Sequence, residues 1–593
     1  MSLQQLLLQS TLPSAPSTTR AVPTPLSAFG DALAYGSGNR VVVREVREPG
    51  AVILGGRHTS PVTAVRISPS GKLVASGDQN GNVLVWARQP DSREVLNTKQ
   101  LQGPVRDIAW THDEERVVLV GDGKSHFATV LSLTGNTIGT INGHTQNIVS
   151  CDMRGERPYR IVTGGADALV GFYEGVPFKF KCNVQGHKDK VTCVRYSPDM
   201  ETIATVSRSP EIVLLDGKTA ELKGSIATGH TGTIYSVAWS PDGSKLATAS
   251  ADKSVKIFDV ATGVMISSCV FGADVMSMQQ GVAYTPQGVF SISLGGELAL
   301  IGEDGKIKGA LLGHQGRILL LHLLSNGTIV SVGVDRALMW RNTNNSLSNA
   351  RKVAIASNVI TAAACCGDYL YLVSGADLLR CALPDTEPTL LSREAANVTA
   401  LAITEDKHAV LLSKNGFVVL DASGRKVAEE KLDKFDGTSA ASHGDMVVLG
   451  GDALVKGYRV KAGESPEAGV QFAGHHAGVV ACVAFAKDGQ RVASGDATRN
   501  IFVWSPVDGS VLYRDLVFHT LRVTSLAFAP HSSARLLSGS MDASLIVWDL
   551  DKRTRKTEDA AHCGGVSAVA WTVDGTLLSG GADFCLRQWN LPT

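Results

Sequence analysis

Short segments that alternate apolar and polar residues recur along the whole chain, each separated from the next by a turn sequence. In one clear unit, residues 235–239 (YSVAW) are followed by the turn 240–243 (SPDG), the small-residue segment 245–250 (KLATAS), a turn with Asp252, and residues 255–259 (VKIFD). Alternation with a period of two predicts strands, and Gly, Asp and Pro between the segments predict tight turns. The unit is therefore expected to form a small antiparallel sheet.

A histidine, often preceded by glycine, marks these units at nearly constant spacing. His144, His187 and His230 follow one another at intervals of 43 residues, and so do three histidines near the end of the chain, the first of which is His476. A period of about 40–45 residues with Gly-His and Trp-Asp marks is the signature of WD repeats, in which each repeat forms a four-stranded blade of a β-propeller.

Most of the marked histidines are followed at a fixed distance by an aspartate in a predicted turn. Because a buried aspartate needs hydrogen-bond partners, we expect each pair to meet inside its blade, with a Ser or Thr and the Trp nearby. A Ser-His-Asp hydrolase triad is the alternative, but a single active site does not recur in seven repeats, so no catalytic residue is predicted. The pairs, spaced by 20 to 23 residues, are His58/Asp78, His144/Asp167, His230/Asp252, His314/Asp335, His476/Asp496, His519/Asp542 and His562/Asp583.

Units of this kind can be placed fourteen times along the chain. Nine are well marked, and five are degraded, the latter near residues 20–46, 276–301, 358–383, 397–420 and 437–460. Propellers usually have four to eight blades, so two rings of seven blades are the natural partition. We therefore expect an all-β protein with two seven-bladed WD40 β-propellers in tandem, the first at residues 13–312 and the second at residues 313–593.

The two ends of the sequence suggest how the second ring is completed. The sequence ends three residues after Asn590, at the third strand of the last unit, so that unit has no outer strand of its own. An unpaired strand edge is a liability for a sheet. We expect the N-terminal segment, residues 1–12, which precedes the first unit, to supply this strand and to complete the last blade of the second propeller.

Composition and motifs exclude several classes of function. Lys+Arg and Asp+Glu both number 56, whereas nucleic-acid-binding proteins usually carry a basic excess. No apolar run reaches the roughly 18–20 residues that cross a bilayer, and no signal peptide is expected. The ten cysteines include no CxxC pair and are expected to be free thiols in a reducing cytosol, with metal or redox use as the alternative. No P-loop or metal-ligand spacing occurs, so we expect no enzyme, no cofactor and no metal.

One part of the first predicted propeller is more specific than the repeat itself. Residues 157–167 read RPYRIVTGGAD and residues 172–181 read FYEGVPFKFK. This stretch resembles the RPYR…TGSDD…FFEGPPFKFKF hallmark of the actin-interacting protein 1 family. Residues 103–110 (GPVRDIAW) and 120–124 (VGDGK) resemble that family's KIKDIAW and VGEGRE segments. The resemblance covers the full chain and is strongest over residues 58–260.

The resemblance implies a cytoplasmic protein of the actin cytoskeleton that works with cofilin to sever and disassemble actin filaments. Family members bind filaments weakly alone and better when cofilin decorates them, they limit regrowth from barbed ends, and they need no nucleotide or metal. We expect a monomer whose partners are actin filaments and cofilin, without nucleic acid or membrane. The alternative is a generic WD-repeat scaffold for another multiprotein assembly.

A candidate binding surface follows from the same stretch. On a strand, Phe178 and Phe180 would lie on one side and Lys179 and Lys181 on the other. Exposed aromatic side chains could anchor a partner and lysines could steer it, whereas packing of each phenylalanine against the neighbouring blade is the alternative. The candidate actin- and cofilin-binding residues, partly carried over from the family by position, are Asp122, Lys124, Asp167, Phe178, Lys179, Phe180 and Lys181.

Three positions depart from the family pattern. Ala166 stands where the family has the first of two consecutive acids, Cys182 replaces the last phenylalanine of the hallmark, and Asp122 is shorter than the family's glutamate. Asp167 belongs to a predicted His/Asp pair as well as to the candidate surface, so both a structural and a binding use are open for it.

Overall fold

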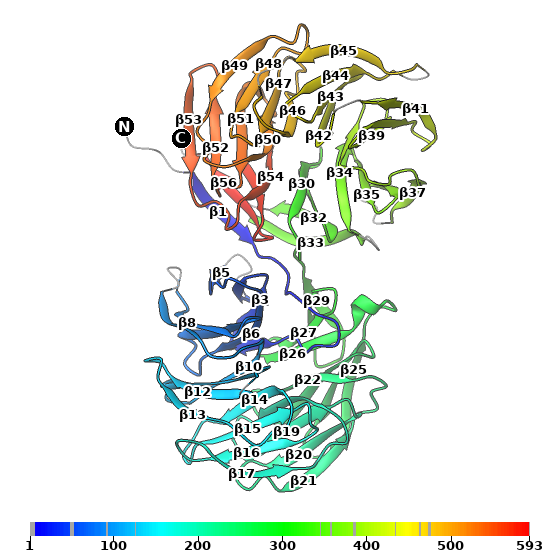
Figure 1. Cartoon of the computed structure of the whole chain (residues 1–593). Coiled ribbons are helices and arrows are strands. Elements are labelled where there is room, and N and C mark those ends of the chain that lie inside the picture. The colour runs from blue at the N-terminus through cyan, green and yellow to red at the C-terminus, as the bar shows by residue number, and fades with distance from the viewer. Residues whose placement is uncertain are drawn as a thin grey trace. The chain divides into compact units, whose positions relative to one another are not determined.

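The architecture of this protein is built from antiparallel strands. Strands form fourteen four-stranded sheets, and the one other regular element in the described part of the chain is a 3-10 turn, η1 (Val275–Ser277) (Figure 1). No helix there is long and apolar enough to cross a bilayer. The predicted all-β fold with fourteen WD-type sheets is confirmed. The structure, a computed structural model, describes residues 6–47, 52–89, 93–124, 126–343, 346–355, 359–383, 387–432, 435–461, 464–472 and 476–591.

Seven of the sheets belong to one compact unit, Ala15–Leu312, here called the first propeller. Each sheet consists of four consecutive strands with the inner strand first. From sheet to sheet the strands are β2 Leu26–Phe29, β3 Ala32–Ser37, β4 Arg40–Glu45 and β5 Val52–Gly55; β6 Val62–Ile67, β7 Leu73–Asp78, β8 Asn82–Ala87 and β9 Glu94–Lys99; β10 Val105–Trp110, β11 Arg116–Gly121, β12 Ala128–Ser132 and β13 Thr137–Thr140; β14 Ile148–Arg154, β15 Arg160–Gly165, β16 Val170–Glu174 and β17 Lys179–Val184; β18 Val191–Tyr196, β19 Thr202–Ser207, β20 Glu211–Asp216 and β21 Leu222–Ala227; β22 Ile234–Trp239, β23 Lys245–Ser250, β24 Ser254–Asp259 and β25 Met265–Val270; β26 Gln279–Thr285, β27 Gly288–Ser293, β28 Leu298–Ile301 and β29 Ile307–Leu311.

The other seven sheets belong to a second compact unit, which comprises Gly313–Thr593 together with the N-terminal segment through Ser14 and is here called the second propeller. Its strands are β30 Ile318–Leu323, β31 Ile329–Gly333, β32 Arg336–Thr343 and β33 Ser346–Ile355; β34 Ile360–Cys366, β35 Tyr369–Ser374, β36 Asp377–Ala382 and β37 Thr389–Ser392; β38 Ala400–Ile403, β39 Ala409–Ser413, β40 Gly416–Leu420 and β41 Lys426–Lys431; β42 Ser439–His443, β43 Met446–Gly450, β44 Val455–Arg459 and β45 Glu467–Phe472; β46 Val480–Phe485, β47 Val492–Asp496, β48 Ile501–Trp504 and β49 Val511–Leu516; β50 Val523–Ala529, β51 Ser532–Ser540, β52 Leu545–Asp549 and β53 Thr554–Glu558; β54 Val566–Trp571, β55 Leu577–Gly581, β56 Leu586–Asn590 and β1 Leu7–Leu12.

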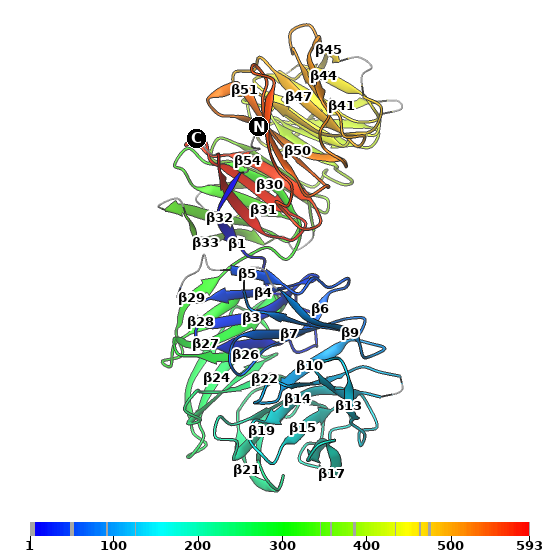
Figure 2. The same cartoon turned by 90° about the vertical axis from the view of Figure 1, so that its left-hand side faces the viewer.

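The sheets of each propeller meet through their inner strands. Each inner strand contacts the inner strands of two neighbouring sheets, and the series returns to its start because β26 contacts β2 and β54 contacts β30. Figure 2 shows the sheet of β26 to β28 beside β3 and β4. The apolar core of each propeller accordingly lies between neighbouring sheets: fully buried Val83 and Val85 of β8, for example, pack against Ile108 and Leu119 of the next sheet.

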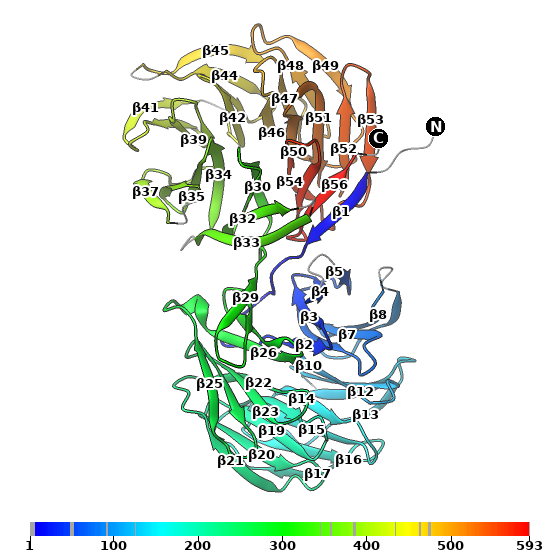
Figure 3. The same ribbon diagram turned by 180° about the vertical axis from the view of Figure 1, so that it is seen from behind.

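The outer strand of the last sheet comes from the N-terminal segment. β1 pairs antiparallel with β56, with Leu8 opposite Trp589 and Leu12 opposite Leu586 (Figure 3). The hydroxyl of Ser10 donates to Oε1 of Gln588 at 3.3 Å. Residues 1–5 of the predicted N-terminal strand lie outside the described residues. The edge of β56 is therefore covered by a strand distant in sequence, which removes an exposed sheet edge.

Threonines near the start of several inner strands tie neighbouring sheets together. The hydroxyl of Thr63 donates to the carbonyl of Val105 at 2.6 Å, 42 residues further on, and Thr524 donates in the same way to Val566 at 2.6 Å. The same kind of bond recurs from Thr192, Thr399 and Thr438 to the start of the next inner strand or to a residue up to two positions before it. Because the donor and the acceptor belong to consecutive sheets, these bonds stabilise the ring itself as well as the single sheet.

The inner strands of the first propeller also carry a lattice of charged side chains. Arg195 of β18 donates through Nη1 to Oδ2 of Asp107 on β10 at 2.8 Å and to Oγ of Ser150 on β14 at 3.0 Å. Ser150 in turn donates to the same Asp107 oxygen at 2.8 Å. Burial opposes ionisation of Asp107, but the charges of Arg195 and Arg66 outweigh it and hold the pKa of the carboxyl below its ordinary value. Three consecutive sheets thus share one buried ion pair.

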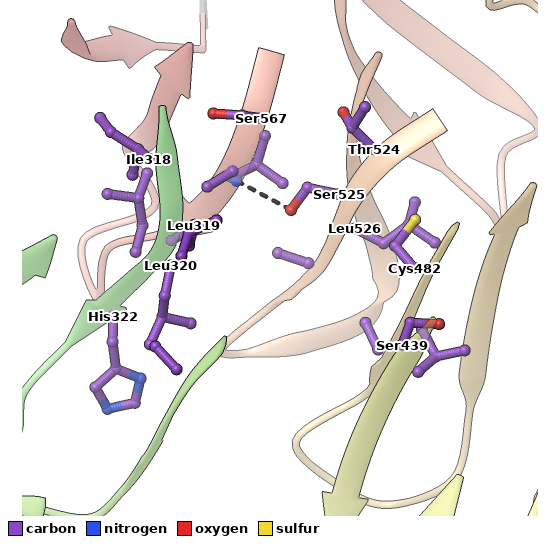
Figure 4. Close-up of a pocket in the computed structure, with 18 of the residues that line it drawn as sticks. Ile318, Leu319, Leu320, His322, Ser439, Cys482, Thr524, Ser525, Leu526 and Ser567 are labelled. Atoms are coloured by element: carbon purple, nitrogen blue, oxygen red, sulfur yellow. Dashed lines mark hydrogen bonds between the residues drawn. The ribbon is translucent and has the colours of Figure 1, made fainter. Parts of the chain in front are cut away.

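The inner strands of the second propeller instead surround a cavity of about 1210 Å³. Small or apolar side chains such as Ile318, Cys482 and Leu526 line it (Figure 4). Ser525 accepts a hydrogen bond from the backbone N–H of Val569 on the next inner strand at 3.1 Å, the dashed line in Figure 4. Among the described lining residues of these strands, His322 is the only histidine or charged residue, and burial lowers its pKa.

Candidate functional site

The structure brings the histidine and the aspartate of all seven predicted pairs together, with Nδ1 between 2.8 and 3.3 Å from a carboxylate oxygen. In the last sheet, Nδ1 of His562 lies 2.8 Å from Oδ1 of Asp583, and Nε2 lies 2.7 Å from Oγ of Ser579. Trp589 donates through Nε1 to the same hydroxyl at 2.8 Å. Ser579 is fully buried, so this hydroxyl joins strand to turn and has no access to a substrate.

The charges of this network follow from its burial. Burial opposes ionisation of Asp583, but the attraction and hydrogen bond of His562, together with Arg587, hold its pKa at about 2. Burial lowers the pKa of His562 more than the carboxylate raises it. At neutral pH the aspartate is therefore an anion and the histidine is neutral, so Nδ1–H donates to the carboxylate.

One marked histidine lacks this partner. Nε2 of His187 lies 2.8 Å from Oγ1 of Thr205, but Nδ1 is buried without a hydrogen-bond partner among the described residues. Ser209 stands where the next repeat has Asp252, 43 residues further on. Burial lowers the pKa of His187 to about 4. This sheet keeps the histidine of the network and has lost the acid.

The hallmark stretch forms most of one sheet, β14 to β17. Oε1 of Glu174 at the end of β16 accepts from Nε of Arg160 at 3.1 Å and from Nζ of Lys181 at 2.6 Å. The backbone N–H of Gly175 donates to the carbonyl of Tyr159 at 3.0 Å. Glu174 therefore holds cations from the two strands that flank it, a role that the sequence analysis did not find. The signal available for it was a charge at the same end of three neighbouring strands.

The two phenylalanines of the stretch occupy different environments. Phe178 precedes β17, has a φ of 67° and packs in the core with Tyr159 and Tyr173, leaving 3 % of its surface exposed. Phe180 lies on β17, is 49 % exposed and meets Tyr173 edge-on, with ring centroids 5.7 Å apart. The expectation that both rings lie on one side of a strand is wrong, because the strand begins at Lys179. Phe178 is a core residue, whereas Phe180 is accessible to a partner.

Phe180 also borders a turn of the blade network. The space beside Gly143 is filled by the Phe180 ring, since a Cβ at Gly143 would lie 2.8 Å from it. The next residue, His144, has Nδ1 2.9 Å from Oδ1 of Asp167. Asp167 also accepts from the backbone N–H of Thr145 at 2.9 Å. Asp167 is thus committed to its sheet, and its side chain is only 5 % exposed.

The remaining candidates are Asp122 and Lys124, which follow β11, and the two lysines of β17. The carboxylate of Asp122 accepts from both Nε (3.2 Å) and Nη2 (2.6 Å) of Arg106, a two-bond ion pair that occupies it. Lys124 is exposed, and so is Lys179 on β17. Within the described ranges, neither lysine has an ion-pair partner, and no hydrogen bond or ion pair joins Asp122 or Lys124 to the β17 segment. The accessible candidates are therefore Lys124, Lys179 and Phe180, with Lys181 partly neutralised by Glu174.

The described part of the chain offers no alternative metal centre. No group of three His, Cys, Asp or Glu residues in it is placed to hold a metal ion. The ten cysteines are free thiols. Burial raises the pKa of several of them, for example Cys482 to about 12, which keeps the thiol protonated and unreactive.

Comparison with known proteins agrees with the repeat architecture. The family described as "WD domain, G-beta repeat" matches residues 53–87, 178–214, 223–259, 468–505, 510–549 and 554–590. The chain is 32% identical over 595 residues to the 66 kDa stress protein of Physarum polycephalum, covering 97% of this chain and 98% of the relative. It is 30% identical over 617 residues to Actin-interacting protein 1-2 of Arabidopsis thaliana, covering 98% and 99%. It is 28% identical over 593 residues to Actin-interacting protein 1 of Drosophila melanogaster, covering 97% and 96%. The chain belongs to the actin-interacting protein 1 family of WD-repeat proteins.

Proposed function

We propose that this protein binds actin filaments in the cytoplasm and cooperates with cofilin to sever and disassemble them, limiting regrowth from barbed ends. It acts as a monomeric binding protein and not as an enzyme. The observation that carries the proposal is the similarity over nearly the whole chain to relatives named actin-interacting protein 1, which includes the hallmark sheet. A generic scaffold for another assembly is the alternative, and it predicts no binding to filaments.

The accessible part of the hallmark sheet has the chemistry that such binding needs. Phe180 offers an apolar ring at the surface, supported from behind by Tyr173. Lys179 and Lys124 are exposed cations without an internal partner among the described residues. Desolvating an aromatic side chain supplies much of the free energy of a protein interface, and exposed lysines speed the encounter with an acidic partner such as actin.

Co-sedimentation with actin filaments, with and without cofilin, tests this proposal. The wild-type protein should pellet with cofilin-decorated filaments, and Phe180→Ala should lose most of that binding while its melting curve stays unchanged. Lys179→Ala combined with Lys181→Ala should weaken the binding as well. Phe29→Ala removes another exposed ring of the first propeller and is the matched control. If Phe180→Ala binds as tightly as the wild-type protein, this surface is not the binding surface. If the wild-type protein does not bind filaments, the proposed function is wrong.

A further inference from the structure

A groove on the second propeller is lined by β49, the outer strand of one sheet, and by strands β52 and β53 of the next. Figure 1 labels these three strands. Its volume is about 530 Å³, within the range of roughly 300–1,000 Å³ that ligand sites occupy. Trp548 and Leu550 line it and are buried. Phe518 (49 % exposed) and Leu512 (44 % exposed) line it as well. An apolar side chain that enters from solvent would therefore be covered on several sides.

Three arginines line the same groove: Arg514 on β49, Arg553 in the turn before β53, and Arg555 on β53. The guanidinium carbon of Arg555 lies 3.2 Å from the centroid of the Phe518 ring, so the two groups stack. Within the described part of the chain, none of the three guanidinium groups has a carboxylate partner. Stacking leaves the N–H donors at the edge of the Arg555 plane free, and those donors match a carboxylate with two parallel hydrogen bonds.

The acids that line the groove do not balance these charges. Of the two that line it, Asp549 accepts from the backbone N–H of Lys552 at 3.0 Å and faces its ammonium at 3.9 Å. That leaves Asp515 against three arginines. Another groove of this propeller is lined by Glu429 and Glu430 of β41 with one lysine and no arginine, and Glu429 is paired with Lys426 at 2.6 Å. The positive charge is thus a property of this groove and not of such grooves in general.

We propose that this groove binds an extended acidic segment of a partner protein. An apolar side chain of the segment occupies the space beside Trp548 and Phe518, and its carboxylates pair with Arg514, Arg553 and Arg555. β49 is the last strand in its sheet, so its free edge can add main-chain hydrogen bonds to an extended segment. The groove is on the second propeller, and the proposal does not depend on the surface around Phe180.

Fluorescence anisotropy with short labelled peptides tests the proposal on the full chain. The probes are a peptide pool in which glutamate alternates with random apolar residues and a matched pool with lysine in place of glutamate. The glutamate pool should bind about tenfold tighter or better than the lysine pool, and its affinity should fall as salt is raised. Equal binding of the two pools, or binding of neither, would overturn the proposal.

Variants place the binding in this groove. A triple variant that combines Arg514→Gln, Arg553→Gln and Arg555→Gln should lower the affinity for the glutamate pool about tenfold or more. Phe518→Leu, which keeps an apolar side chain against Trp548, should weaken it less. Glu429→Gln with Glu430→Gln in the acidic groove is the matched control and should leave affinity unchanged. Melting curves verify that each variant is folded, and full binding by the folded triple variant would also overturn the proposal.

Discussion

The inner strands of the first propeller share a buried ion pair, whereas those of the second surround a cavity with mostly small or apolar side chains. Arg195 donates to the carboxylate of Asp107 and to the hydroxyl of Ser150, and Ser150 donates to the same carboxylate, so three sheets are joined. In the second propeller, Ser525 makes a single neutral bond to the next inner strand. Both arrangements bring seven sheets into a ring, so the ring itself does not require either chemistry. The side chains on the inner strands therefore decide how much stability each ring loses when one of these side chains is removed.

The propellers differ in their histidine networks as well. All four marked histidines of the second propeller have an aspartate partner, and in each of these sheets a tryptophan donates to the same serine. In the first propeller, His187 has no acid. Each marked histidine of the second propeller therefore has its acid within its own sheet, whereas the inner strands of the first propeller carry the Asp107–Arg195 pair between sheets, and one histidine there has no aspartate.

The largest expected effect is that of Asp107→Ala. The substitution leaves the largely buried Arg195 guanidinium, whose side chain is 18 % exposed, without its carboxylate, and breaking a buried ion pair in this way costs about 3–5 kcal/mol. Calorimetry should show an earlier transition for the first propeller and an unchanged one for the second. Ser525→Ala, the matched change in the second propeller, removes only a neutral bond and should cost about 1 kcal/mol. Similar losses for the two variants would break the comparison.

A pH effect comes next in size. Because burial lowers the pKa of His187 to about 4, the unfolded chain binds this proton more readily than the folded chain, and stability falls as the pH drops. The stability that comes from keeping His187 neutral is fully present above the ordinary histidine pKa of about 6.5. Roughly 3 kcal/mol of the free energy of unfolding is lost as the pH falls to about 4. Ser209→Asp supplies the missing acid and should flatten this part of the profile. The free energy of unfolding of the wild-type protein and of Ser209→Asp is measured between pH 7 and pH 4. Identical pH profiles for the two proteins would show that His187 is not the source of the effect.

The smallest effect should be the same in both propellers. Thr63→Val and Thr524→Val keep the shape of the side chain and remove the bond between neighbouring inner strands. Each leaves a carbonyl without this donor and should cost about 1 kcal/mol in its own propeller. Denaturant unfolding of the two variants measures this directly. A loss confined to one propeller would show that the threonine bond depends on the chemistry around it.

Much of this fold was predictable because the same spacing of marker residues and the same alternation of apolar and polar residues recur in many units. The spacing of His476, His519 and His562 sets the period, and the alternation in weaker units such as residues 358–383 was enough to place strands β34 to β36. The His/Asp pairs were predictable for the same reason. The pair of Asp107 and Arg195 was not, because 88 residues separate two single charges in apolar strands and nothing local marks them as partners.

The candidate surface was harder to predict than the fold. Alternation alone extends the strand through Phe178, but the Gly175-Val176-Pro177 turn delays its start by one residue and sends the ring into the core. The family resemblance predicted Asp122 and Asp167 as binding residues. In the structure, however, the carboxylate of Asp122 is paired with Arg106, and that of Asp167 is paired with His144. Sequence shows which residue types stand in a motif, whereas the number of internal partners that each one has depends on neighbouring sheets.

Covering β56 with β1 has a consequence for biosynthesis. Ser10 and Gln588, which meet in the finished sheet, are 578 positions apart, so a ribosome makes nearly the whole protein before β1 can find its partner. Domains tend to fold as they emerge, N-terminal ones first, and the first propeller lies between these two strands in the sequence. A nascent chain would thus carry a completed ring and a waiting strand at the same time. Until β56 is made, that strand has no partner of its own and can pair with a strand of another chain.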